Sequence, residues 1–258
     1  MRKLVIATAL IVLGAATTAY AAIATDSGSI SYSSKKAGTP TKPVPLGYTL
    51  NFTQAGTNGN RPPIQLDVKL KLYGMKFDGK DFPTCSATKI ATAHNDTVCP
   101  KGALIASGYI HSVLGSATNF NAAQAPGFAC DPLLHVWNSG QGKQTYFFLT
   151  DATHQCGGLK TGSTPPYPGT SKEVGKYVMS DVPIPRYIDY PVAGLVGSLE
   201  YEHLVFTAHT AKVHGKTVSS MSAFGCLHGK RPYTITSTTT LPGQGKEVDN
   251  IKGSPRCS

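Results

Sequence analysis

The fold class is decided by the stretch Ile64-Gln65-Leu66-Asp67-Val68-Lys69-Leu70-Lys71-Leu72. Its five apolar residues alternate with four polar residues, which is the period of a β-strand whose successive side chains point to opposite faces. A helix would scatter the same residues around its axis. The stretch therefore predicts a half-buried strand with one face against a hydrophobic core.

Short apolar runs of similar character recur along the chain, separated by turns rich in Gly and Pro. They predict strands over 46–53, 103–114, 133–138, 144–150, 176–182, 193–201, 203–213, 217–224 and 232–241. A short helix is expected over 86–93, with Ser86 as its N-cap. The chain is therefore expected to be all-β, as an antiparallel β-sandwich stapled by disulfides, with a closed barrel as the alternative.

Composition and length narrow the class of protein further. The 258-residue chain is 40% hydrophobic, which excludes a wholly disordered chain and allows a sizeable core. Charged residues make up 15% of the chain, against roughly 25% in an average protein, which disfavours coiled coils and long charged helices. We expect one β-sandwich domain over 46–258, preceded by a Pro-, Ser- and Lys-rich segment over 22–45 that forms an extended arm or a first edge strand. A division into two domains near 157–172 is the alternative.

The N-terminus has the features of a secretory signal peptide. Arg2 and Lys3 precede an apolar run over 4–16, and Ala19-Tyr20-Ala21 is an A-x-A cleavage pattern. An uncleaved anchor is the alternative, but the unbroken apolar run is shorter than the about 20 residues that a membrane-spanning helix needs. We therefore expect residues 1–21 to be removed from a protein exported to the cell envelope or the medium, without a stable membrane anchor.

All six cysteines follow the predicted cleavage site. An even number of cysteines in an exported chain predicts disulfides rather than free thiols. Of the 15 possible pairings, the simplest joins neighbours in chain order: Cys85–Cys99, Cys130–Cys156 and Cys226–Cys257. No C-x-x-C pair is present, which disfavours a structural zinc site.

A pattern of cysteines, prolines and glycines gives the chain a resemblance to a known group. Phe82-Pro83-Thr84-Cys85 before the expected helix, Cys99-Pro100 after it, and Phe224-Gly225-Cys226 with a last Cys257 resemble uncharacterised exported β-rich proteins predicted from soil actinobacterial genomes. The likeness touches the strands over 64–112 and 199–258. It implies an exported, Cys-containing β architecture and no activity. Cys130 and Cys156 depart from the pattern, so the middle third lies outside the resemblance.

The predicted mature chain is basic. Without residues 1–21 it has 22 Lys and Arg against 14 Asp and Glu, a net charge of +8. These residues are spread out, and no dense basic run is interleaved with aromatics, which disfavours nucleic-acid binding. Spread positive charge attracts polyanions in a salt-dependent manner, so an anionic envelope or matrix polymer is the expected partner class. The oligomeric state stays open.

Few residues suggest catalysis or metal binding. The chain has no G-x-S-x-G, H-E-x-x-H or dinucleotide-binding pattern. Glu200 and Glu202 are two apart on an expected strand and would share a face, about 6.6 Å apart between Cα atoms, which a glycosidase acid pair allows. A solvated strand face is the simpler interpretation. His203 and His209 would also share a face but lie about 20 Å apart, too far for one metal ion.

Aromatic residues cluster on an expected hairpin and in Pro-rich loops. Exposed rows of such rings bind sugars by stacking, whereas alternating positions on a hairpin are typical of a core. The residues concerned are Trp137, Tyr146, Phe147, Phe148, Tyr167, Tyr187 and Tyr190.

Together these observations predict an exported, non-enzymatic protein, structural or ligand-binding, with no catalytic residue, cofactor or metal ligand assigned. The alternative is a secreted carbohydrate-active hydrolase or lyase on a β-sandwich scaffold. An acid pair with strongly raised pKa values in an aromatic-lined cleft would favour that alternative.

Overall fold

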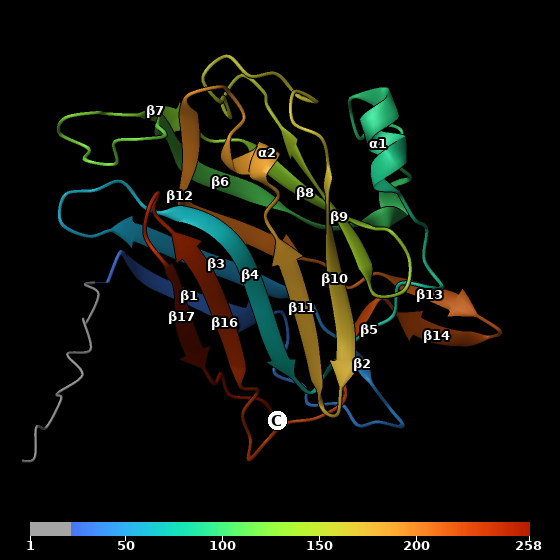
Figure 1. The fold of residues 1–258 in the computed structure, drawn as a ribbon. Coiled ribbons are helices and arrows are strands. Elements are labelled where there is room, and N and C mark those ends of the chain that lie inside the picture. The colour runs from blue at the N-terminus through green and yellow to red at the C-terminus, as the bar shows by residue number, and fades with distance from the viewer. Residues whose placement is uncertain (1–21) are drawn as a thin grey trace, which may run out of the picture.

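The computed structural model describes residues 22–258, so the predicted signal peptide over 1–21 lies outside the described residues. Most of the ordered structure is antiparallel β (Figure 1). The strands of the main sheet are β1 (Ala24–Tyr32), β3 (Tyr48–Gly56), β4 (Ile64–Tyr73), β6 (Leu104–Ser116), β7 (Phe128–Cys130), β8 (Leu133–Asn138), β9 (Lys143–Leu149), β10 (Tyr167–Val174), β11 (Tyr177–Pro183), β12 (Leu195–Phe206), β16 (Tyr233–Thr240) and β17 (Lys246–Gly253).

Two small sheets and two helices complete the fold. The first small sheet contains β2 (Val44–Pro45), β5 (Met75–Phe77) and β15 (Met221–Ala223), and the second is the hairpin of β13 (Thr210–Val213) and β14 (Lys216–Ser219). The helices are α1 (Ala87–Ala93) and α2 (Arg186–Asp189), with a 3-10 turn at Lys101–Ala103. None of the helices within residues 22–258 is long and apolar enough to cross a membrane.

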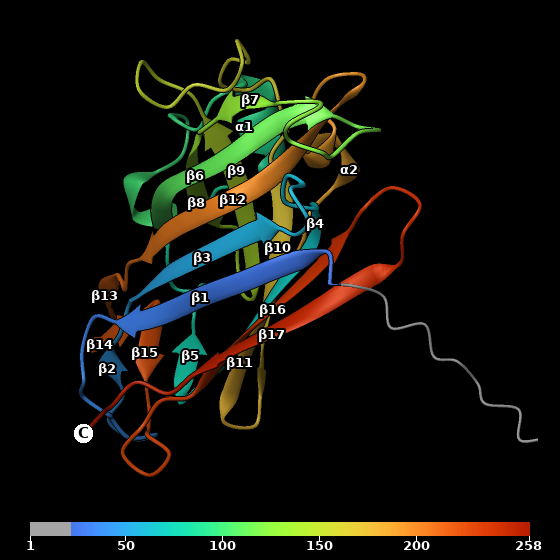
Figure 2. The same ribbon diagram turned by 90° about the vertical axis from the view of Figure 1, so that its left-hand side faces the viewer.

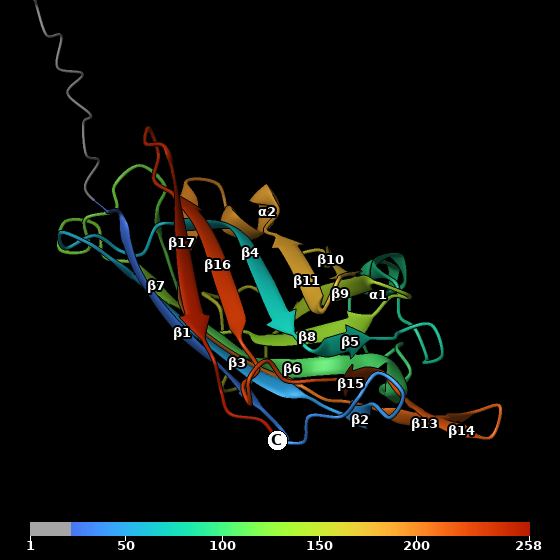
Figure 3. The ribbon, with the colours of Figure 1, turned by 90° about the horizontal axis from the view of Figure 1, so that it is seen from below.

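The main sheet curls until it is nearly closed. Its strand order is β1-β3-β12-β6-β8-β9-β10-β11-β4-β16-β17, with β7 paired to β6. The two edge strands, β1 and β17, lie side by side (Figures 2 and 3). The expected antiparallel β class with three disulfides is confirmed, but the arrangement is barrel-like rather than a sandwich. One continuous ladder wraps around the interior, because each strand pairs with the next around the curve.

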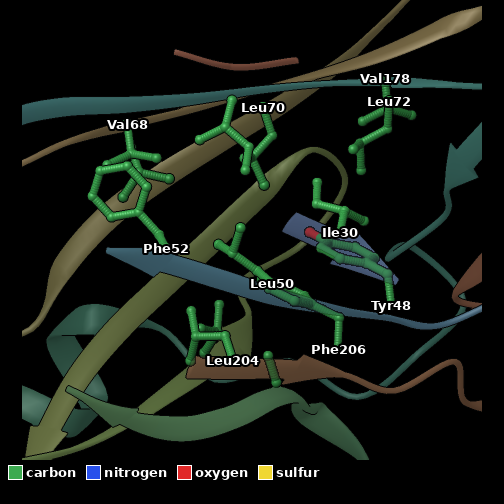
Figure 4. Packing of buried hydrophobic residues seen from close by; sticks show 14 of the residues in the cluster. Ile30, Tyr48, Leu50, Phe52, Val68, Leu70, Leu72, Val178, Leu204 and Phe206 are labelled. Atoms are coloured by element: carbon green, nitrogen blue, oxygen red, sulfur yellow. The ribbon is translucent and has the colours of Figure 1, made fainter. Parts of the chain in front are cut away.

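The core fills the interior of this curved sheet. Figure 4 shows Val68 and Leu70 of β4 lying opposite Leu50 and Phe52 of β3, strands that are not neighbours in the ladder. The strand predicted over 64–72 is confirmed as β4. The predicted strict alternation of buried and exposed side chains is wrong at one point, because the pairing of β4 with β16 shifts by one residue between Asp67 and Gln65.

The predicted helix over 86–93 is confirmed as α1. The Ser86 hydroxyl accepts a hydrogen bond from the Lys89 amide at 3.2 Å, which is the expected N-cap. Ile90 and the Cys85–Cys99 disulfide pack this helix against Trp137 and Phe147 on the outside of the main sheet. The second helix, α2, was not predicted. Its four residues follow Pro185, which is the N-cap residue and has an extended backbone.

The three disulfides join Cys85 to Cys99, Cys130 to Cys156 and Cys226 to Cys257, the pairing predicted from their order. Cys130 ends β7, and Cys156 lies in the long loop after β9. Residues 24–32 form edge strand β1, which is the edge-strand alternative expected for the segment over 22–45.

Candidate functional site

A largely apolar cavity lies within the curved sheet, beneath α2. Its volume is about 140 Å³. Apolar cavities of roughly 150 Å³ hold a molecule the size of benzene. The apolar side chains that line it include Leu50, Val68, Leu70, Ile110, Leu114, Phe148, Val182, Ile184, Ile188, Leu199, Leu204 and Phe206.

Glu202 brings a carboxyl group into this apolar wall from β12. Its side chain is 9% exposed and lines the cavity. A β-bulge places it there: Leu199 pairs with Ser112 and Tyr201 with the adjacent His111, which leaves Glu200 without a partner on β6. Because the extra residue shifts the alternation, Leu199 and Glu202 both face inward.

Asp189 brings a second carboxyl group to the cavity from α2. It is 6% exposed. Helix α2 follows the end of β11 and lies over the end of the curved sheet (Figure 1). The turn buries Asp189 while Arg186 and Tyr187 stay exposed.

Neither carboxyl group has a charged or hydrogen-bonding partner among residues 22–258. Burial alone raises the pKa of Glu202 to about 7 and the pKa of Asp189 to about 8, since it penalises the charged form. Asp96 is a useful contrast, because it is similarly buried at 5% exposure but has hydrogen-bonding partners at one carboxylate oxygen. Its carboxylate accepts hydrogen bonds from His135 at 2.6 Å and from the Trp137 indole at 3.1 Å.

Two tyrosines line the cavity near these acids. Tyr146 of β9 and Tyr167 of β10 are buried, and their ring centroids lie 5.2 Å apart in a stacked arrangement. Burial raises the pKa of Tyr167 well above its usual value, and the charges of Glu202 and Asp189 both add to this effect. Tyr167 therefore lies within electrostatic reach of both carboxyls.

The loop over 150–166, between β9 and β10, forms the mouth of the cavity. Lys160 and Ser163 line the cavity and are exposed, so the interior communicates with solvent here. The Cys130–Cys156 disulfide also lines it and ties the loop to β7. The Thr161 hydroxyl accepts a hydrogen bond from the Thr150 amide at 2.8 Å, which anchors the loop again near its start.

The structure separates the two glutamates that the sequence suggested as a pair. Glu200 is exposed at the bulge, whereas Glu202 is buried in the cavity wall. The assumption of a shared face is wrong, because it requires a regular strand between them. The sequence carried no sign of Asp189, since its role depends on a helix that was not predicted.

The aromatic residues proposed for sugar stacking lie mainly inside the molecule. Trp137, Tyr146, Phe147 and Tyr167 are buried, as expected for core positions, and Tyr187 is exposed.

A different aromatic cluster lies on the outer face of β3, β6 and β12. Tyr109 stacks on His203 with ring centroids 5.2 Å apart, and His111 stacks on Tyr201 at 5.9 Å. Asn51 accepts hydrogen bonds from the Tyr201 hydroxyl at 2.9 Å and from the His203 ring at 2.7 Å. The rings therefore pack mainly on one another. No group of three potential metal ligands occurs in the part of the chain that the structure describes.

Comparison with known proteins supplies no relative. No protein-family model, curated protein or solved structure matches this chain. The function is therefore inferred from the geometry of the cavity.

Proposed function

We propose that this chain is an exported, non-enzymatic binding protein that holds one small, largely apolar molecule inside its curved sheet. The observation that carries the proposal is the apolar cavity of about 140 Å³, open to solvent beside Lys160 and Ser163. Protein interiors are normally packed to the density of organic crystals, so a cavity of this size within the core is unusual. Ligand sites are typically concave, mostly apolar and equipped with a few polar groups, and this cavity has those properties.

Glu202 and Asp189 have raised pKa values and line the cavity with two tyrosines, which is the feature that the enzyme alternative predicted. The separate environments of the two carboxyls nevertheless favour binding over glycoside hydrolysis. A glycosidase needs two carboxyls that work on one bond, close enough for each to influence the other. Here Glu200 is outside the cavity, and the pKa values of Glu202 and Asp189 are raised by burial alone. Each carboxyl therefore acts as a separate polar group.

Export is supported by two independent features. The N-terminal 21 residues carry the charge, apolar run and cleavage pattern of a signal peptide. All six cysteines are paired in disulfides, which persist in oxidising compartments.

Toluene binding to the chain over 22–258 tests the proposal. We expect calorimetry to show saturable toluene binding. Gly197→Leu should weaken the affinity at least about tenfold, because the leucine side chain would fill space that the toluene ring needs. Losing the burial of even one methylene group costs about 1 kcal/mol, and the ring would lose more than that. Gly197 lines the cavity, and an added Cβ would meet its nearest neighbours at 3.7 Å, so the strand accepts a side chain there.

Gly245→Leu is the matched control, because this glycine is exposed and an added Cβ meets nothing within 4 Å. It should bind toluene as the unchanged protein does. Absence of toluene binding to the unchanged protein, or equal binding by a folded Gly197→Leu protein, would reject the cavity as the binding site.

A further inference from the structure

The ionisable side chains in the interior of the cavity are all acidic. Glu202 and Asp189 are buried in the wall, and the one basic residue among the described residues lining it, Lys160, is exposed at the mouth. Tyr146 and Tyr167 add aromatic rings and hydroxyl groups. The interior of the cavity therefore offers hydrogen-bond acceptors and aromatic rings, and none of the described residues places a cation there.

This combination selects among small apolar ligands. A bound anion would face two carboxyls and no buried positive group. A neutral molecule would leave the carboxyls in a largely apolar environment without a charged partner. A protonated amine would give the carboxyls a charged hydrogen-bonding partner. Hydrogen bonds between charged groups are about twice as strong as neutral ones, and they are strengthened further in a low-dielectric interior.

The tyrosine pair favours the same ligand. Aromatic rings carry a negative face that attracts cations, including the ammonium groups of ligands. Tyr146 and Tyr167 line the cavity, and both feel the charge of Glu202. An ammonium group near Glu202 would therefore also lie near two aromatic rings.

We infer that the cavity takes a small primary amine whose carbon skeleton is a single ring or a short apolar chain. Its ammonium group donates hydrogen bonds to Glu202 or Asp189, and its skeleton packs against the apolar wall that includes Leu50, Leu70 and Leu204. The inference rests on the proposed function and names the ligand class of the same site.

Binding of such an amine depends on pH in a defined direction. The titratable groups within electrostatic reach of Glu202 are Tyr48, Tyr146 and Tyr167, and Tyr167 is also within reach of Asp189. Lys160 is the charged group at the mouth. Since the acids have pKa values of about 7 and about 8 without ligand, amine affinity should rise from pH 5 to pH 8 as the carboxylates form.

Four one-ring probes of similar size test the inference: benzylamine, benzyl alcohol, toluene and benzoate. At pH 8 we expect calorimetry to show benzylamine binding at least about tenfold more tightly than toluene, the effect of one hydrogen bond to a charged group. Benzyl alcohol should lie between them, and benzoate should not bind. At pH 5 the preference for benzylamine should shrink, while toluene affinity stays constant.

Glu202→Gln and Asp189→Asn identify the anchoring carboxyl. At least one of them should lower the ratio of benzylamine affinity to toluene affinity about tenfold, and a cooperative thermal transition by circular dichroism shows that the variant is folded. Glu200→Gln, exposed on the same strand, is the matched control and should bind both probes normally.

The outcomes separate the two proposals. Toluene binding with no preference for benzylamine at pH 8, or a preference that does not change with pH, overturns the amine inference and leaves the proposed function standing. If none of the four probes binds, the proposed function fails and the inference fails with it.

Discussion

The buried carboxyl groups of Glu202 and Asp189 lower the stability of the folded protein when they are ionised. A buried carboxyl without a partner loses its hydration and gains no compensating hydrogen bond, so the folded state favours its protonated form. Proteins break such rules mainly at functional sites, where stability is given up for a prepared polar group. The partnered Asp96, with its two hydrogen bonds, shows that this fold can satisfy a buried acid where no ligand is needed.

The stability of the ligand-free protein should therefore fall as the pH rises. The pKa values of Glu202 and Asp189 rise on folding, from 4.5 to about 7 and from 3.8 to about 8. The folded state binds these protons more tightly, so their contribution is fully present below about pH 4 and is lost by about pH 8. Each carboxyl lowers the free energy of unfolding by up to about 1.4 kcal/mol per pH unit within its window.

Urea denaturation of the variants isolates this effect. At pH 8, Glu202→Gln should raise the free energy of unfolding by about 3 kcal/mol and Asp189→Asn by about 5 kcal/mol, because neither amide ionises. Near pH 4 they should match the unchanged protein. Glu200→Gln should change little at either pH, and equal pH profiles for all four proteins would contradict the buried-acid interpretation.

At the scale of elements, the bulge in β12 determines which side chains reach the cavity. Glu200 takes up one extra position against β6, so residues before and after it follow opposite alternation. Without the bulge, the outward-facing Tyr201 and His203 would exchange faces with Glu202 and Leu204.

Deleting Glu200 should therefore be far more damaging than changing it. We expect the deletion to abolish the cooperative thermal transition, because it moves one half of β12 onto the wrong face. Glu200→Ala should keep the fold, with a change in stability within about 0.5 kcal/mol, as is usual for exposed positions. A normal circular dichroism melting curve for the deletion would show that the bulge does not control the register.

The irregularities in β4 and β12 mark the limit of what could be predicted from the sequence within single strands. Alternation located β4, and the Ser86 cap located α1, because both depend on neighbours in the chain. The phase shifts at Leu66 and Glu200 depend on which distant strand pairs with each segment, and no local pattern records that. Two buried polar residues at the cavity, Gln65 and Glu202, were assigned to the wrong face for this reason.

At the scale of the whole molecule, the Cys130–Cys156 disulfide is positioned to control how a ligand enters and leaves the cavity. It closes a segment with a sequence separation of 26 and lines the cavity at its mouth. The Cys226–Cys257 disulfide, with a separation of 31, joins the loop after β15 to the chain beyond β17 and does not line the cavity.

Replacing each pair by serine should separate stability from access. In the chain-entropy model either loss costs about 3–4 kcal/mol of stability. Only Cys130→Ser/Cys156→Ser should also speed toluene dissociation, because the loop over 150–166 is then released from β7. NMR exchange spectroscopy measures the rate, and equal exchange in the two double variants would show that this loop does not limit access.

The global shape was harder to predict than the strands. The strands over 193–201 and 203–213 were expected separately but merge into β12 up to Phe206, because the bulge lets one strand bend. A sandwich and a nearly closed sheet use the same short strands and differ in the order of pairing. That order is set by contacts between distant segments, such as β4 with β11 and β16. The attraction to anionic polymers, inferred from net charge, stays a prediction.

The seam between β1 and β17 has a consequence for self-association. Glu247 of β17 accepts hydrogen bonds from the amides of Ile23 and Ala24 at 2.8 and 3.2 Å, so a side chain occupies donors at the start of β1. Strand β17 also carries Lys246, Asp249 and Lys252. A second molecule that added a strand here would have to bury these charges, which is how natural edge strands resist fibre growth. The incomplete closure that leaves the sheet two edges thus comes with its own barrier to aggregation.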